Sequence, residues 1–311
     1  MTWVAWRLQR TETLIALGIL ALLAGLLVPT GITIAHAYHD DGLGSCLALN
    51  PSAICGQEIS AFQQRFQTLT NLSNWFTLVP GLIGVLLAAP FIHDLEHGTY
   101  RLAWTQSITR GRWLRGKLGL ATIAALFASG ALILLLTWWR SPFVNLNGRL
   151  DTGTYDSEGT VVIGYTIFAL ALALALGALW RRTAASLAVA FVGYFTLRVL
   201  VDLELRNHLV SPLKATWKGI QQPHYLYHAL ILQQRSASIR RGHPHHIAAG
   251  GFLGGHVQLA APGLGHNPTF HALYIPASDF WPLQLTETAL YAGTAALLIA
   301  FTVWWTRNHV A

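Results

Sequence analysis

The chain of 311 residues is 53% hydrophobic and only 11% charged, with a net charge of +7. Soluble domains carry about 25% charged residues, so this composition excludes a disordered chain, a collagen and an ordinary soluble enzyme. It indicates an all-α polytopic membrane protein. The positive charge does not predict nucleic-acid binding, because the basic residues follow the expected membrane topology.

Six apolar stretches are each long enough to cross the bilayer core as a helix, which takes roughly 20 residues. They are Leu14–Ala35, Leu72–Ile92, Leu118–Trp138, Val161–Leu179, Ala184–Val201 and Leu283–Trp305. The first stretch is longer than the core of a signal peptide and lacks a good cleavage site, so we expect a retained span. Residues 1–311 are expected to form one membrane domain with a long outer segment, 202–282.

Lys and Arg residues in the short connections predict the orientation, because they are enriched in cytoplasmic loops. On the side of the termini lie Arg7, Arg10, Arg101, Arg110, Arg112, Arg115, Lys117, Arg181, Arg182 and Arg307. On the opposite side lie only Arg65, Arg140 and Arg149. We therefore expect a multi-pass protein of the cell membrane with both termini in the cytoplasm.

The stretch Gly111–Lys117 has the spacing of a phosphate-binding loop, but its context is wrong. Leu118 stands where Ser or Thr would bind magnesium, and no apolar strand precedes the stretch. We expect Lys117 to reach the inner lipid surface instead of a phosphate. The chain is expected to bind no cofactor itself, so any ATP and magnesium would be held by a partner.

The cytoplasmic loop from His93 to Gly116 mixes Trp, Thr, Gln, Glu and Arg in an ordered way. A solvated basic loop would explain the arginines alone. Trp and Arg residues anchor protein contacts, so the mixture favours a docking surface. Gly98 is expected to allow the turn out of the second span. Glu96 is expected to pair with a basic group on a partner or to cap a helix in the loop.

The pattern Glu96-x-Gly98-Thr99, with Leu102, Thr105, Thr109-Arg110 and Lys117, resembles the first cytoplasmic loop of type-2 ATP-binding-cassette (ABC) exporter permeases. The stretch Glu-His-Gly-Thr-x-Arg-Leu-Ala-Trp-Thr-Gln-Ser is similar to an actinobacterial branch of that family. The N-terminal Thr2-Trp3-Val4-x-Trp6-Arg7 and the outer loop with His39-Asp40 also resemble that branch. The resemblance covers most of the first 120 residues, and beyond them it depends on span number and loop lengths.

This resemblance implies a six-span permease with an N-terminal interfacial helix, a cytoplasmic coupling helix, and outer re-entrant helices between spans five and six. It implies a non-enzymatic transport subunit that pairs with a second permease copy, most simply as a homodimer, and with separate ABC ATPase subunits. The residues expected to couple to the ATPase are Glu96, Gly98, Thr99, Arg101, Trp104, Arg110 and Arg112. The exported substrate is expected to be amphipathic or hydrophobic, because the spans offer few polar groups.

Cys46 and Cys55 are the only cysteines, and both lie in the first outer loop. Because this compartment is oxidising, a structural disulfide is favoured over two free thiols. Most of the 14 histidines lie between His208 and His271, with irregular spacing and no cysteine among them. A polar outer loop explains them, so no metal site is expected.

Three charged residues near the membrane, Arg198, Asp202 and Glu287, have two possible roles. Ionisable groups within spans are costly, which favours a place on the substrate pathway. Alternatively, their side chains reach the outer interface. Two other functions also stay open for the whole chain: a membrane-embedded metal-dependent hydrolase that uses the outer histidines, and a non-transporting membrane sensor or immunity protein.

Overall fold

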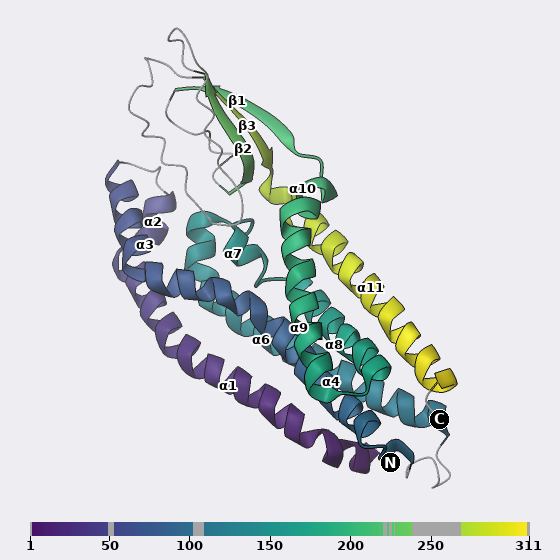
Figure 1. The fold of residues 1–311 in the computed structure, drawn as a ribbon. Helices are drawn as coiled ribbons and strands as arrows, with labels where there is room; N and C mark the ends of the chain where they lie inside the picture. Colours follow the sequence, from purple (N-terminus) through teal and green to yellow (C-terminus); the bar gives the residue numbers. More distant parts are fainter. Residues whose placement is uncertain are drawn as a thin grey trace.

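The structure, a computed structural model, describes residues 2–48, 53–101, 109–219, 223, 226, 228–237 and 269–309. A bundle of long helices carries a small β-sheet at one end (Figure 1). Six helices in the described ranges are long and apolar enough to cross a membrane. The predictions of six spans and of a mainly helical membrane fold are therefore confirmed.

The helices and strands fall into three groups. The long helices are α1 (Thr2–Asp40), α3 (Ala53–Ser73), α4 (Val79–Glu96), α6 (Arg110–Asn147), α8 (Val161–Trp180), α9 (Thr183–Leu200) and α11 (Phe280–His309). The short helical elements are α2 (Leu43–Ala48), η1 (Asn74–Leu78), α7 (Thr152–Tyr155), the π-helical turn η2 (Val201–Leu205), α10 (Arg206–Leu209) and η4 (Ala277–Asp279). The strands are β1 (Leu213–Lys218), β2 (Leu230–Ala237) and β3 (Thr269–Ile275).

Helix α8 is the centre of the bundle and packs against α4, α6, α9 and α11. It has no charged residue, and small Ala and Gly residues alternate with Leu along it. A Cβ atom on Gly84 of α4 would lie 2.3 Å from the carbonyl oxygen of Thr166 in α8. A Cβ atom on Gly177 of α8 would lie 2.4 Å from Ile92 of α4. These glycines let the two backbones approach closely, as small residues do between membrane helices.

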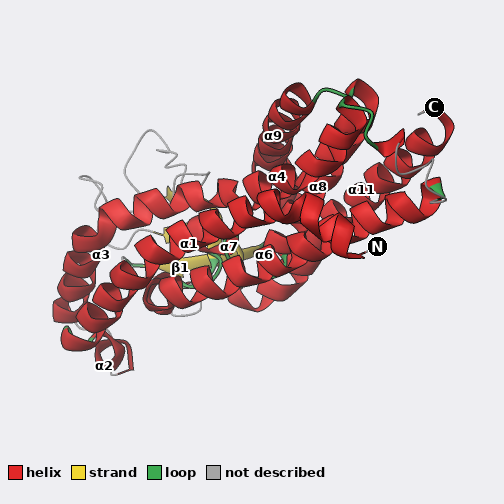
Figure 2. Ribbon diagram, turned by 90° about the horizontal axis from the view of Figure 1, so that it is seen from below, coloured by secondary structure: helices red, strands yellow, loops and turns green. Residues whose placement is uncertain are grey.

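Helix α1 runs beside α6 on the outside of the bundle (Figure 2). The indole nitrogen of Trp139 in α6 donates a hydrogen bond to the Thr30 hydroxyl in α1 at 3.0 Å. Residues 2–13 continue directly into the first span within α1. An interfacial position for them stays a prediction, since no separate N-terminal helix is present among the described residues.

Beyond the first span, a disulfide joins Cys46 of α2 to Cys55 of α3, with Cα atoms 5.8 Å apart. The predicted bridge is therefore confirmed. From α3, the chain passes through η1 into α4, so the second predicted span has a helical extension at its N-terminal end. Both termini lie at the opposite end of the molecule from the β-sheet (Figure 1).

The outer segment between α9 and α11 contains an antiparallel sheet in the order β1-β3-β2. In β1, Ala215 and Trp217 are buried while their neighbours are exposed, which is the alternation of a half-buried strand. The Trp217 ring stacks on Phe270 of β3, with ring centroids 5.3 Å apart. The expectation of an all-α chain with re-entrant helices here is wrong for the described part of this segment, because alternating aromatic and polar residues favour strands.

Candidate functional site

The chain turn that follows α4 forms the inner site, which we define as residues 93–101 together with Thr183. The N–H of His97 donates to the carbonyl of His93 at 3.0 Å and closes the last turn of the helix. Gly98 follows with a φ of +70°, a left-handed backbone conformation that favours glycine. Gly98 therefore turns the chain out of α4 and toward residues 102–108, which lie outside the described ranges.

Glu96 connects the inner site to the beginning of α9. Its Oε2 atom accepts a hydrogen bond from the N–H of Thr183 at 2.9 Å and another from the Thr183 hydroxyl. Thr183 is the first residue of α9. A carboxylate at a helix N-terminus satisfies an unpaired N–H and interacts favourably with the helix dipole. Glu96 thus caps α9, which differs from the expected cap on a loop helix or ion pair with a partner.

Asp94 holds the inner site against α6. It accepts a hydrogen bond from the Thr99 hydroxyl at 3.0 Å and forms an ion pair with Lys117 of α6 at 2.7 Å. Lys117 is 5% exposed. Gly111–Lys117 is helical, so this stretch forms no phosphate-binding loop. The expectation that Lys117 reaches the lipid surface is wrong, because Lys117 is buried and pairs with the half-buried Asp94.

The remaining predicted coupling residues lie near the same end of the bundle. Arg101 follows the turn at Gly98 and is exposed. Arg110 and Arg112 are exposed in the first turn of α6, one to two turns before Lys117. Trp104 lies outside the described residues. The structure therefore brings Glu96, Gly98, Thr99 and Arg101 into one turn and places the other two arginines on the adjacent helix.

A second set of polar residues, the outer cluster, is buried toward the end that carries the sheet. Its members are Tyr155, Asp156, Tyr165, Arg198, Asp202, Arg206 and Glu287. Arg198 pairs with Asp156 at 2.5 Å. Arg206 contacts three carboxylates: Asp156 at 2.6 Å, Glu287 at 3.3 Å, and Asp202 one helical turn earlier. The three predicted residues therefore belong to one ionic network.

Two tyrosines complete the outer cluster. Tyr155 donates to Glu287 at 3.0 Å, and Tyr165 donates to the other oxygen of the same carboxylate at 2.7 Å. Glu287 is fully buried and Arg198 is 2% exposed, so these side chains do not reach the outer interface. Burial alone would raise the pKa of Asp156. The charges of Arg198 and Arg206 have the larger, opposite effect, so the pKa of this carboxyl lies below the usual value for an Asp.

Sequence reasoning missed Asp156, Arg206 and the tyrosines. Arg206 follows Asp202 by four residues, a helical spacing that would have predicted the pair if the fifth span had been continued through η2. Asp156 lies in the connection between α6 and α8, and nothing in the sequence relates it to Arg198 or Arg206. No metal site is predicted from the outer histidines: His243, His245, His246, His256 and His266 lie outside the described residues, and His271 lies on β3 with its Nδ1 atom 3.0 Å from the Thr216 hydroxyl.

Helix α9 links the two sites. Thr183 begins this helix at the inner site, and Arg198 lies in its last turn at the outer cluster. At 1.5 Å per residue, the 18 residues of α9 span about 27 Å, close to the thickness of the bilayer core. Helix α9 therefore connects the inner site directly to the ionic network at its other end.

Comparison with protein families gives one match that covers most of the bundle. Residues 17–206 match the model of the family described as ABC-2 membrane transporter related. The matched region extends from α1 to the first residue of α10 and contains the inner site and most of the outer cluster. Comparisons with curated proteins and with solved structures found no match. Because the match covers more than half of the chain, this protein belongs to the ABC-2 membrane transporter related family.

Proposed function

We propose that the chain is the membrane permease of an ATP-driven exporter. In this proposal, a separate ABC ATPase hydrolyses ATP in the cytoplasm, where both termini lie, and a second permease copy completes the transport unit as a homodimer. Permeases of the matched family normally work with an ATPase subunit, which supports this assignment. Membrane spans with few polar side chains favour an amphipathic or hydrophobic substrate.

The main support for this proposal is the contact between Glu96 and Thr183, which joins the cytoplasmic loop to the first residue of α9. The loop at residues 97–109 provides the docking surface. It contains the exposed Arg101 and leads into α6, where Arg110 and Arg112 are exposed. When the ATPase moves this loop, Glu96 pulls on the first turn of α9. The ion pair between Lys117 of α6 and Asp94 of α4 keeps these two helices joined, so the displacement acts on α9.

The outer cluster converts the movement of α9 into opening at the outer face. Two guanidinium groups there face three carboxylates, so the network can exchange partners without leaving an arginine unpaired. A shift of α9 moves Arg198 relative to Asp156, which lies in the α6–α8 connection and does not move with α9. Packed interfaces of this kind switch between discrete arrangements. Arg198, Asp202 and Glu287 therefore act at an outer gate of the substrate pathway.

The test is a reconstituted complex. The chain is purified from its native membrane with any associated ABC ATPase, and both subunits are returned to liposomes. The proposal expects the permease to change the ATP turnover of the ATPase, and it expects Arg101→Ala with Arg112→Ala to abolish the association while the permease keeps its thermal stability. An ATPase whose turnover is the same with and without the permease would contradict the proposal.

A further inference from the structure

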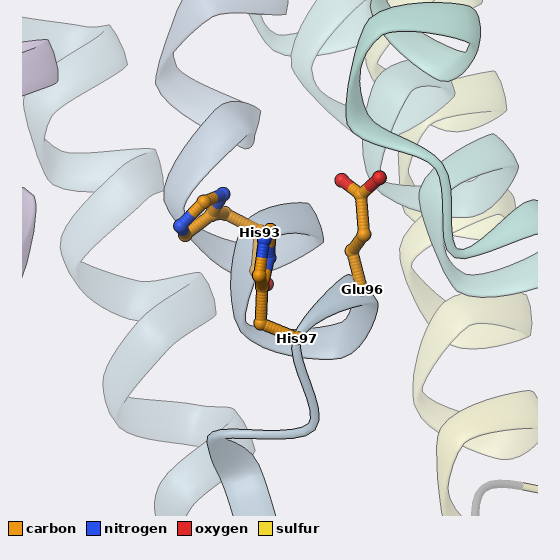
Figure 3. Close-up of side chains that lie close together, drawn as sticks. All are labelled: His93, Glu96 and His97. Carbon is orange, nitrogen blue, oxygen red and sulfur yellow. The ribbon is translucent and has the colours of Figure 1, made fainter.

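Two exposed histidines of the inner site have no role in the coupling described above. His93 in the last turn of α4 and His97, which caps this helix, lie four residues apart, so both imidazoles lie on one side of the helix end (Figure 3). Their ring centroids are 4.1 Å apart. Two histidines at this helical spacing are the pair that holds zinc in helical metal sites.

The hydrogen bond of His97 prepares its ring for metal binding. The Nδ1 atom lies 3.2 Å from the backbone carbonyl oxygen of His93. A carbonyl only accepts, so Nδ1 carries the proton and Nε2 keeps its lone pair. Metal-binding histidines commonly donate their other ring N–H to such an oxygen, which fixes the tautomer and the ring orientation.

Glu96 supplies a third ligand between the two histidines in sequence. One ligand atom from each of the three residues lies within 4.8 Å of the others. A tetrahedral zinc ion with bonds of about 2.0–2.1 Å needs these atoms roughly 3.3 Å apart. All three side chains are exposed, so small rotations about their side-chain bonds bring them into range. Both hydrogen bonds from Thr183 end on Oε2 of Glu96, so rotation of this carboxylate toward the two rings competes with its contact to Thr183.

We propose that His93, Glu96 and His97 form a binding site for a divalent late transition metal, Zn²⁺ or Cu²⁺, at the inner site. Two imidazoles and one carboxylate suit these borderline ions, whereas Mg²⁺ and Ca²⁺ require mainly oxygen ligands. Three protein ligands leave the fourth position of a tetrahedral ion to water. The nearby Asp94 is engaged by Lys117 and Thr99.

Metal binding at this site would oppose the coupling of the cytoplasmic loop to α9 through Glu96, a consequence that rests on the proposed function. Figure 3 shows the Glu96 carboxylate directed away from the two rings, toward the neighbouring segment of the chain. A cation that holds Glu96 against the imidazoles draws it away from Thr183 and removes the contact that moves α9. Zn²⁺ is therefore expected to inhibit ATP-driven movement in the complex.

The binding test uses the full-length chain in detergent, with its affinity tag removed, and Cu²⁺ as the probe. Because outer histidines can also bind Cu²⁺, the readout is a difference between variants. Electron paramagnetic resonance of the wild type is expected to show one more bound Cu²⁺ per chain, with nitrogen splitting from two imidazoles, than His93→Asn with His97→Asn. Glu96→Gln should weaken that one site about tenfold. His309→Asn, an exposed histidine on α11, should leave it intact.

Equal Cu²⁺ stoichiometry and equal spectra in the wild type and the double variant would overturn the site. The single variants His93→Asn and His97→Asn repeat the comparison if the double variant does not fold. A second arm adds Zn²⁺ to the reconstituted complex. If Cu²⁺ binding is lost in the variants but Zn²⁺ leaves ATP turnover unchanged, the metal site stands and the proposed coupling through Glu96 fails.

Discussion

Replacing Arg206 by Met should destabilise the protein more than replacing Arg198 by Met, although both side chains are buried. Arg206→Met leaves Asp202 and Glu287 without an ionic partner in the outer cluster. Arg198→Met affects only Asp156, which keeps its contact with Arg206. Breaking a buried ion pair by removing one partner costs about 3–5 kcal/mol.

At roughly 2 °C of melting temperature for each kcal/mol in a chain of this size, Arg206→Met should lower the midpoint by about 8 °C. Intrinsic tryptophan fluorescence during heating in detergent measures this shift. Arg307→Met, an exposed change on α11, serves as the control and should shift the midpoint by less than 1 °C on the scale typical of surface substitutions. Equal shifts for Arg206→Met and Arg198→Met would refute the argument that Arg206 is the centre of the network.

Three further changes test other parts of the structure by the same melting assay. Burial raises the pKa of Glu158, against the opposing effect of nearby arginines, so its ionised form costs stability. Glu158→Gln should therefore raise the midpoint at pH 8, and the gain should vanish as the pH falls below that raised pKa; a constant gain across pH would contradict this. Gly84→Ala should cost about 1–3 kcal/mol because its Cβ meets the Thr166 carbonyl, whereas Gly130→Ala, with open space around it, should not. Cys46→Ser should cost about 2–3 kcal/mol through loss of the short disulfide loop, and a reducing agent should shift the wild type by the same amount but leave this variant unchanged.

The membrane spans could be predicted from the sequence because each one is a local property. A run of apolar residues such as Val161–Leu179 is helical wherever it lies in a bilayer, since its backbone groups must pair internally. The disulfide was also predictable, because the chain contains only Cys46 and Cys55. Helix ends were less predictable: α3 and α6 extend beyond the apolar stretches, where polar residues continue the helix outside the membrane.

The sites depend on contacts between distant residues, and these were not predictable. Glu96 looked like a residue for a partner, because nothing in the sequence relates it to Thr183, 87 residues later. The carboxylate of Glu287 looked able to reach the interface, because Arg206 and the tyrosines that surround it come from other elements. The outer sheet was missed because its strands are short and far apart in the chain.

Coupling through the inner site is tested most directly by ATP turnover of the reconstituted complex with Thr183→Val. This change removes the hydroxyl that contacts Glu96 and keeps the shape of the side chain. Thr122→Val is the matched control, because the Thr122 hydroxyl bonds only to the carbonyl of Leu118 in its own helix. We predict that Thr183→Val, which keeps only the backbone N–H bond to Glu96, reduces the effect of the permease on turnover, that the added Glu96→Gln reduces it further, and that Thr122→Val retains it. Full retention in both threonine variants would contradict the account.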